Sequence, residues 1–143
     1  MLVEKAALKN LHCIRLNSGD DVLESIRNAA AKQGVKNAII LAGTGSTVNY
    51  HYHIVTSVTF PPENVSVKGE GSSDVCNVNG LIINGRVHAH ITHSNTEGTH
   101  GGHLEEGVKV NTFMAITFAE IDLDLDKWDS LERFEENRKI SRG

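Results

Sequence analysis

The tightest constraint on the fold of this chain comes from a histidine-rich stretch, RVHAHITHSNTEGTHGGHL, at residues 86–104. His88 and His90 lie two positions apart in a run rich in β-branched residues. Side chains two positions apart on a β-strand point to the same face, so a strand here presents both imidazoles together. We interpret the glycine pair before His103 as part of a turn, which lets the backbone approach closely and brings a third imidazole in from another direction.

Three neutral imidazoles that leave one coordination position open suit zinc or a similar divalent ion. We therefore predict a metal site held by His88, His90 and His103, because histidine is the commonest metal ligand in proteins. The pattern does not choose the metal, since imidazole suits zinc, copper, iron and nickel alike.

Other polar residues of this stretch lie near the predicted ligands. His93 is three positions past His90 and faces the other way on a regular strand, so we interpret it as a structural residue. His100 either joins the site or only lines it. Glu97 and Glu105 are close enough in sequence to line the pocket, to hydrogen-bond a ligand or to act as a general base.

Length and composition indicate one domain over residues 1–143, with 39% hydrophobic and 22% charged residues, as in ordinary globular proteins. The net charge of −4 does not favour nucleic-acid binding, which usually needs a basic patch. Cys13 and Cys76 form no CxxC motif, and we expect buried or half-buried thiols in a reducing compartment. No apolar run predicts a membrane span or a signal peptide, so we expect a cytoplasmic location.

The order of predicted elements gives the fold class. A helix is expected from about Asp21, whose side chain with Glu24 resembles a capping box, to a stop at Gly34. Asn84-Gly85 is a hairpin signal, and a second helix is predicted at about residues 127–139. Six stretches are typical of β-strands, namely residues 12–16, 38–42, 65–70, 75–83, 86–92 and 110–126. Together they predict an α+β fold with a largely antiparallel sheet flanked by helices.

Two further motifs have no clear chemistry in the sequence. Gly43-Thr44-Gly45-Ser46 resembles the start of a dinucleotide-binding loop, but Val48 occupies the third glycine position and β-type sequence follows. We interpret these glycines as a tight turn or a bulge. His51 and His53 form a second HxH pair without a third ligand nearby in sequence, and we assign it to one face of a strand or to a subunit contact.

From about His12 to Glu120, the chain resembles the PPC domain, whose name stands for plants and prokaryotes conserved. The resemblance rests on the order and spacing of several short motifs, which are GDDVLESI at 19–26, AGTGS at 42–46, GEG at 69–71, HAH at 88–90, GGHL at 101–104 and Glu120.

The resemblance implies an antiparallel sheet flanked by helices that assembles as a homotrimer. In prokaryotic members the histidines of the HxH and GGH motifs are associated with a bound metal, usually read as zinc, and here they are His88, His90 and His103. Family members are commonly described as DNA-binding. In plant members an AT-hook with an Arg-Gly-Arg core precedes the domain, and this sequence contains no such core.

These observations favour a metal-binding protein of the PPC type whose role the sequence does not resolve, with DNA binding and regulation as the candidates that the resemblance implies. The alternative is a small metal-dependent hydrolase or lyase, because a zinc ion held by three histidines can lower the pKa of bound water to about 7. A third hypothesis is a purely structural metal, which predicts that removing the ion lowers stability without any loss of activity.

Overall fold

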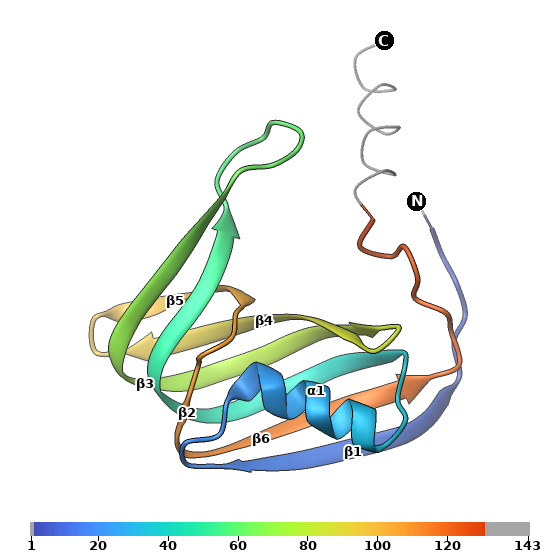
Figure 1. Ribbon diagram of the computed structural model, residues 1–143, viewed down its shortest axis with the longest axis horizontal. Coiled ribbons are helices and arrows are strands. Elements are labelled where there is room, and N and C mark those ends of the chain that lie inside the picture. The colour runs from blue at the N-terminus through green and yellow to red at the C-terminus, as the bar shows by residue number, and fades with distance from the viewer. Residues whose placement is uncertain (1, 131–143) are drawn as a thin grey trace.

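The computed structural model describes residues 2–130, which form an antiparallel six-stranded β-sheet and one helix (Figure 1). The strand order across the sheet is β1-β6-β2-β3-β4-β5. In chain order the elements are β1 (Leu8–Asn17), α1 (Val22–Lys32), β2 (Ala38–Val55), β3 (Asn64–Ile83), β4 (Arg86–Asn95), β5 (Gly98–Leu104) and β6 (Val110–Ile121).

The long strand β2 pairs with three others and closes one end of the sheet on itself. Its first half pairs with β6 and its whole length follows β3, while Tyr52 and His53 near its end pair with Leu104 and His103 of β5. Register shifts within β2, such as the one between Gly45 and Thr47, mark bulges that bend the strand. The bulge predicted for the small-residue motif at 42–46 is thereby confirmed.

Helix α1 begins and ends as the sequence predicts. The Asp21 side chain accepts a hydrogen bond from the Glu24 amide at 3.0 Å, and Gly34 follows the helix with a φ of +68°. The helix buries Val22, Leu23, Ile26 and Ala30 against one face of the sheet, where it contacts β1 and β4. Burying a side chain such as Ile26 contributes about 1.5–3 kcal/mol, so this face is the main hydrophobic core.

The helical content is lower than expected. Within residues 2–130, α1 is the only α-helix, so the sheet is not flanked by helices. The predicted helix at 127–139 does not begin at Lys127, because residues 126–129 form turns in which the Trp128 amide donates to the Leu125 carbonyl at 3.0 Å. The remainder of that predicted helix lies outside the described residues. In the described part of the chain, no helix is long and apolar enough to cross a membrane.

Other differences concern strand ends and side-chain burial. The strand predicted for 110–126 ends at Ile121. Beyond that residue the chain leaves the sheet, and the Leu125 amide donates to the Asn37 side chain at 3.3 Å. The glycine-rich stretch before His103 belongs to strand β5 and is not a turn. Cys13 and Cys76 are exposed free thiols, because both lie on the solvent face of their strands, so the expectation that they are buried is wrong.

Candidate metal centre

Strand β4 presents its histidines as the period of a strand predicts. Ala89 and Ile91 are buried in the core, and His88 and His90 therefore point to the opposite, open face. His93 lies on the core face, is completely buried, and sits 3.3 Å from the Thr47 hydroxyl through Nδ1. The opposite orientation expected for His93 is confirmed, and it is not part of the open face.

Strand β5 adds His103 to the same open face. His103 lies directly across from His90 of β4 and from His53 of β2. Its ring centroid is 4.8 Å from that of His88, 5.7 Å from that of His90 and 4.4 Å from that of His53. All three predicted ligands thus line one cleft of about 410 Å³, together with His53, Ile54, Val55 and Gly102.

A glycine at position 102 is needed for this arrangement. A Cβ atom there would lie 2.5 Å from the carbonyl oxygen of His53 and 2.9 Å from a ring carbon of Tyr52. Because a backbone oxygen cannot move aside, only glycine lets β5 approach β2 closely enough to pair. The glycine pair of the GGH motif therefore positions His103 by close strand contact.

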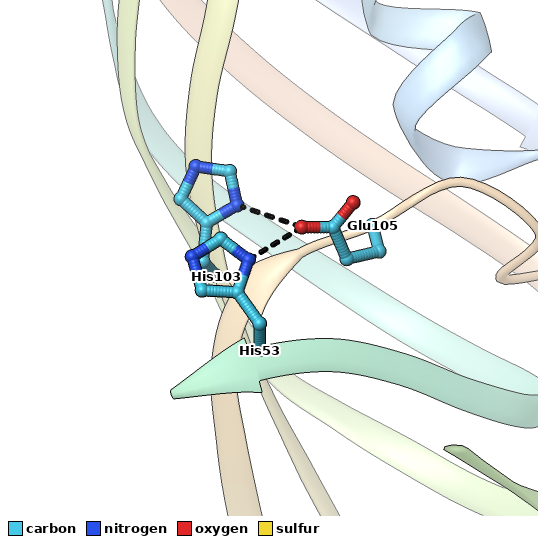
Figure 2. Close-up of side chains that lie close together, drawn as sticks. All are labelled: His53, His103 and Glu105. Atoms are coloured by element: carbon cyan, nitrogen blue, oxygen red, sulfur yellow. Dashed lines mark hydrogen bonds and ion pairs between the residues drawn. The ribbon is translucent and has the colours of Figure 1, made fainter. Parts of the chain in front are cut away.

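His53 and Glu105 form the tightest ligating group of the cleft with His103 (Figure 2). The Nδ1 atom of His53 donates to Oε1 of Glu105 at 2.5 Å, and Nδ1 of His103 lies 3.6 Å from the same oxygen. Among residues 2–130, this is the one group of three metal-ligating side chains whose ligand atoms all lie within 4.8 Å of one another. His88 and His90 line the cleft outside that close group.

Sequence reasoning missed His53 as a site residue. It is separated from His103 by 50 positions, and only the pairing of β2 with β5 joins them. The available signal was the HxH spacing of His51 and His53, which puts both on one strand face. His51 does not enter the cleft, since its ring nitrogens contact the Glu106 carbonyl at 2.7 Å and the Ser66 hydroxyl at 3.1 Å.

The protonation state of the cleft suits a cation. Burial, followed by the neighbouring imidazoles, lowers the pKa of both His90 and His103 below the ordinary value of 6.5. These two rings are therefore neutral at pH 7, as metal binding requires. The Nδ1 atom of His103 is buried and has no hydrogen-bond partner among the described residues, so a ligand at this position would satisfy it.

His88 is oriented by a carboxylate from the end of the described chain. Its Nδ1 donates to Oδ2 of Asp129 at 3.1 Å, and Arg86 holds the same carboxylate with bonds of 2.7 Å and 3.0 Å. The Arg86 hydrogen bond is the main cause that lowers the pKa of Asp129 to about 2. With Nδ1 fixed as the donor, Nε2 of His88 is the acceptor nitrogen available to a metal.

The other candidate residues divide between the two faces of the β4–β5 hairpin. Glu105 contacts His53 and His103 beside the cleft, whereas Glu97 lies exposed in the tight turn between β4 and β5. His100 lies across from His93 on the core side, where its ring centroid is 5.5 Å from that of His93 and 4.6 Å from that of Tyr50. The structure therefore does not bring His100 or Glu97 to the predicted metal ligands.

Comparison of the sequence with protein families gives a match to the Plants and Prokaryotes Conserved (PCC) domain over residues 3–122. This family is the same as the PPC domain that the sequence motifs resemble. No curated protein sequence matches the chain at a significant level.

Solved structures share this fold. A plant- and prokaryote-conserved protein from Pyrococcus horikoshii has 26% identity and a TM-score of 0.71, with 87% of each chain covered. A metal-containing protein from Archaeoglobus fulgidus has 16% identity and a TM-score of 0.77, with 87% of this chain and 88% of that chain covered. A "putative dna binding protein" from Bacteroides thetaiotaomicron has 14% identity and a TM-score of 0.71, over 83% of this chain and 86% of that one.

Proposed function

The chain belongs to the Plants and Prokaryotes Conserved domain family, and on this premise we propose that it is a metal-binding protein that holds a divalent ion, zinc, in the histidine cleft. The proposed ligands are His88, His90 and His103. The observation that carries the proposal is their convergence on one open face from two adjacent strands. When bound, such an ion supplies a Lewis acid or a rigid cross-link between strands β4 and β5.

The donor chemistry of the cleft supports this proposal. The imidazoles of His90 and His103 are neutral at pH 7, and the Asp129 carboxylate fixes the ring of His88 in the arrangement common among zinc-binding histidines. The metal-containing protein from Archaeoglobus fulgidus has the same fold, which is consistent with a metal centre on this scaffold.

Elemental analysis of the purified full-length chain tests the proposal. We expect at least one zinc ion per chain, and we expect the His88→Ala/His90→Ala variant to lose an ion. The His51→Ala variant is the matched control, because His51 is an imidazole on a neighbouring strand that contacts Glu106 and Ser66 outside the cleft. Absence of metal from the wild type, even after incubation with zinc, would contradict the proposal.

We also propose that the chain forms the homotrimer that the family resemblance implies. The supporting observation is an apolar row on the sheet face opposite α1, where Leu11, Ala119 and Ile39 are cross-strand neighbours. Leu11 is 57% exposed and Ile39 on the other side of Ala119 is 38% exposed, so the row leaves an apolar strip open to water. Light scattering should give about three times the chain mass of 15.6 kDa, whereas Leu11→Glu/Ile39→Glu should give the monomer mass. A monomeric wild type would exclude the trimer.

DNA binding is the role suggested by the name of the Bacteroides relative. The net charge of −4 opposes it, because counterion release from phosphates needs a basic surface. At physiological salt, non-specific DNA binding typically has a dissociation constant of about 10⁻⁴ to 10⁻⁶ M, and we expect fluorescence anisotropy at that salt to show weaker affinity than this. Tighter binding would establish a DNA-binding role and overturn this expectation.

Hydrolase or lyase chemistry is the second candidate. It is supported by the Glu105 carboxylate, whose Oε1 lies 2.5 Å from Nδ1 of His53 and 3.6 Å from Nδ1 of His103. If an ion held by the histidines bound water, this carboxylate would be the nearby proton acceptor. A test is the hydrolysis of p-nitrophenyl acetate by the zinc-loaded chain. If Glu105→Gln hydrolyses the ester at the wild-type rate, Glu105 has no catalytic role.

A cytoplasmic location is proposed as well. Cys13 and Cys76 are both free thiols and both are exposed to solvent. Exposed thiols that remain unpaired are typical of a reducing compartment, where disulfides are rare.

A further inference from the structure

More ligating side chains converge on the cleft than one tetrahedral ion needs. The four imidazoles of His53, His88, His90 and His103 line it. The carboxylate of Glu105, which contacts His53 and His103 beside the cleft, is a fifth ligating group. A tetrahedral zinc ion uses at most four protein ligands, and a catalytic zinc ion uses three. The excess indicates either that two of these groups have another role or that the cleft holds a second ion.

The side chains fall into two groups that meet at His103. On one side, its Nδ1 atom lies 3.6 Å from Oε1 of Glu105, and its ring stacks on His53 with a centroid distance of 4.4 Å and an interplanar angle of 20°. Figure 2 shows the Nδ1 atoms of both rings directed at the same carboxylate oxygen. The rings of His88 and His90 instead lie at 72° and 63° to the ring of His103.

We infer that His53, Glu105 and Nδ1 of His103 form a second divalent-cation site beside the proposed three-histidine site. His103 is shared, with Nδ1 facing the second ion and Nε2 left for the first. This inference rests on the proposed function only for the first ion. His53 and Glu105 lie outside the HAH motif at 88–90 and the GGHL motif at 101–104, so the family resemblance assigns them no role.

The donor set fits a divalent transition metal. Two imidazoles and one carboxylate hold zinc in some hydrolases and iron(II) in some oxygenases, and three protein ligands leave coordination positions open. The ligand atoms already lie within 4.8 Å of one another, so an ion can be bound by small side-chain movements. The buried Nδ1 of His103 has no hydrogen-bond partner within residues 2–130. Coordination to the ion would satisfy this nitrogen.

Binding at this site requires two changes of protonation. The proton that Nδ1 of His53 donates to Glu105 is displaced by the ion, and it leaves to solvent or is replaced by one on Nε2. A neutral imidazole has one ring proton, so His103 must release it to solvent in order to donate electron pairs to two ions. Occupation of both sites therefore releases at least one proton per chain, which calorimetry in buffers of different ionisation enthalpy measures.

The experiment is a titration of the metal-free full-length chain with Co²⁺, followed by visible absorption and by calorimetry. We expect two ions per chain in the wild type. His53→Ala/Glu105→Gln should bind one ion, and the lost site should be weakened more than about 100-fold, since even outer hydrogen-bond partners contribute 10–100-fold. His88→Ala/His90→Ala should also retain one ion, and the control His51→Ala should retain two. Circular dichroism establishes that each variant is folded.

Each outcome separates the two sites. If the wild type binds one ion and His53→Ala/Glu105→Gln binds it equally well, the second site is refuted and the proposed function stands. If His88→Ala/His90→Ala keeps the full wild-type metal content, while His53→Ala/Glu105→Gln binds none, the proposed three-histidine site fails and the second site stands.

Sharing of His103 is tested separately with Cu²⁺ and electron paramagnetic resonance. Two Cu²⁺ ions bridged by one imidazole couple magnetically and lose the resonance signal of isolated Cu²⁺. Two uncoupled signals would refute the sharing.

Discussion

Acidification should destabilise the fold through His93, the completely buried imidazole on the core face of β4. Burial, with a smaller contribution from the neighbouring His100, lowers the pKa of His93 to about 4 from the ordinary value of 6.5. Because the folded-state pKa is the lower one, the unfolded chain binds the proton more readily between these values. Stability is therefore complete above about pH 6.5 and is lost as the pH falls towards 4.

The size of the effect follows from the two pKa values. Proton binding to His93 with a pKa of 6.5 in the unfolded state and about 4 in the folded state lowers the free energy of unfolding relative to pH 8. The reduction is about 1.4 kcal/mol at pH 5.5 and about 2.5 kcal/mol at pH 4.5. These losses are large against the 5–15 kcal/mol that stabilises a typical domain. Below about pH 4 the contribution levels off, because His93 is then protonated in both states.

Urea unfolding of the metal-free chain between pH 8 and pH 4.5, followed by circular dichroism, measures this curve. His93→Gln is expected to be less stable at pH 8, and its deficit relative to the wild type should shrink by about 2.5 kcal/mol on reaching pH 4.5. Thr47→Val removes the hydroxyl 3.3 Å from Nδ1 but keeps the imidazole, so its deficit should change little with pH. A His93→Gln deficit that stays constant over the whole range would refute the argument.

Three further predictions concern the cleft. Asp129→Asn should weaken zinc binding about 10–100-fold without unfolding the chain, because the variant no longer fixes His88 with a carboxylate. Competition with a chelator measures the zinc affinity, and Asp126→Asn is the control. Gly102→Ala should lower the free energy of unfolding in urea by about 1–3 kcal/mol and should separate His103 from His53, because its Cβ would overlap the His53 carbonyl. A variant as stable as the wild type would contradict the close approach of the two strands. Free zinc at 100 times its dissociation constant should stabilise the fold by about 2.7 kcal/mol per site, and a thermal melt unchanged by chelation would exclude a structural metal.

The parts of the fold that the sequence predicted are those fixed by local geometry. The start of α1 at Asp21 depends on a bond to an amide three residues away, and its end depends on the positive φ of Gly34. The shared face of His88 and His90 follows from the two-residue period of a strand. Each of these features is decided within a few residues, so a single sequence contains the necessary information.

The parts that were missed depend on contacts between distant segments. The glycine pair before His103 was interpreted as a turn, because glycine usually interrupts strands, whereas β5 uses Gly102 to approach β2. His53 enters the cleft only because β2 bends and pairs with both β6 and β5. Neither the bend nor the second pairing leaves a periodic signal in the sequence around His53.

The two faces of the β4–β5 hairpin explain why counting histidines cannot identify a metal site. His90 and His103 form a cross-strand pair on the open face, and His93 and His100 form an equivalent pair on the core face. On the core face, the nearby polar partner of His93 is a neutral hydroxyl, which neither attracts a cation nor orients the ring for one. On the open face, the carboxylates of Glu105 and Asp129 lie beside the imidazoles, offset the charge of a bound cation and fix the ring tautomers. The carboxylate partners, contributed by segments outside the hairpin strands, are therefore what distinguishes the proposed ligand histidines from the core histidines in this fold.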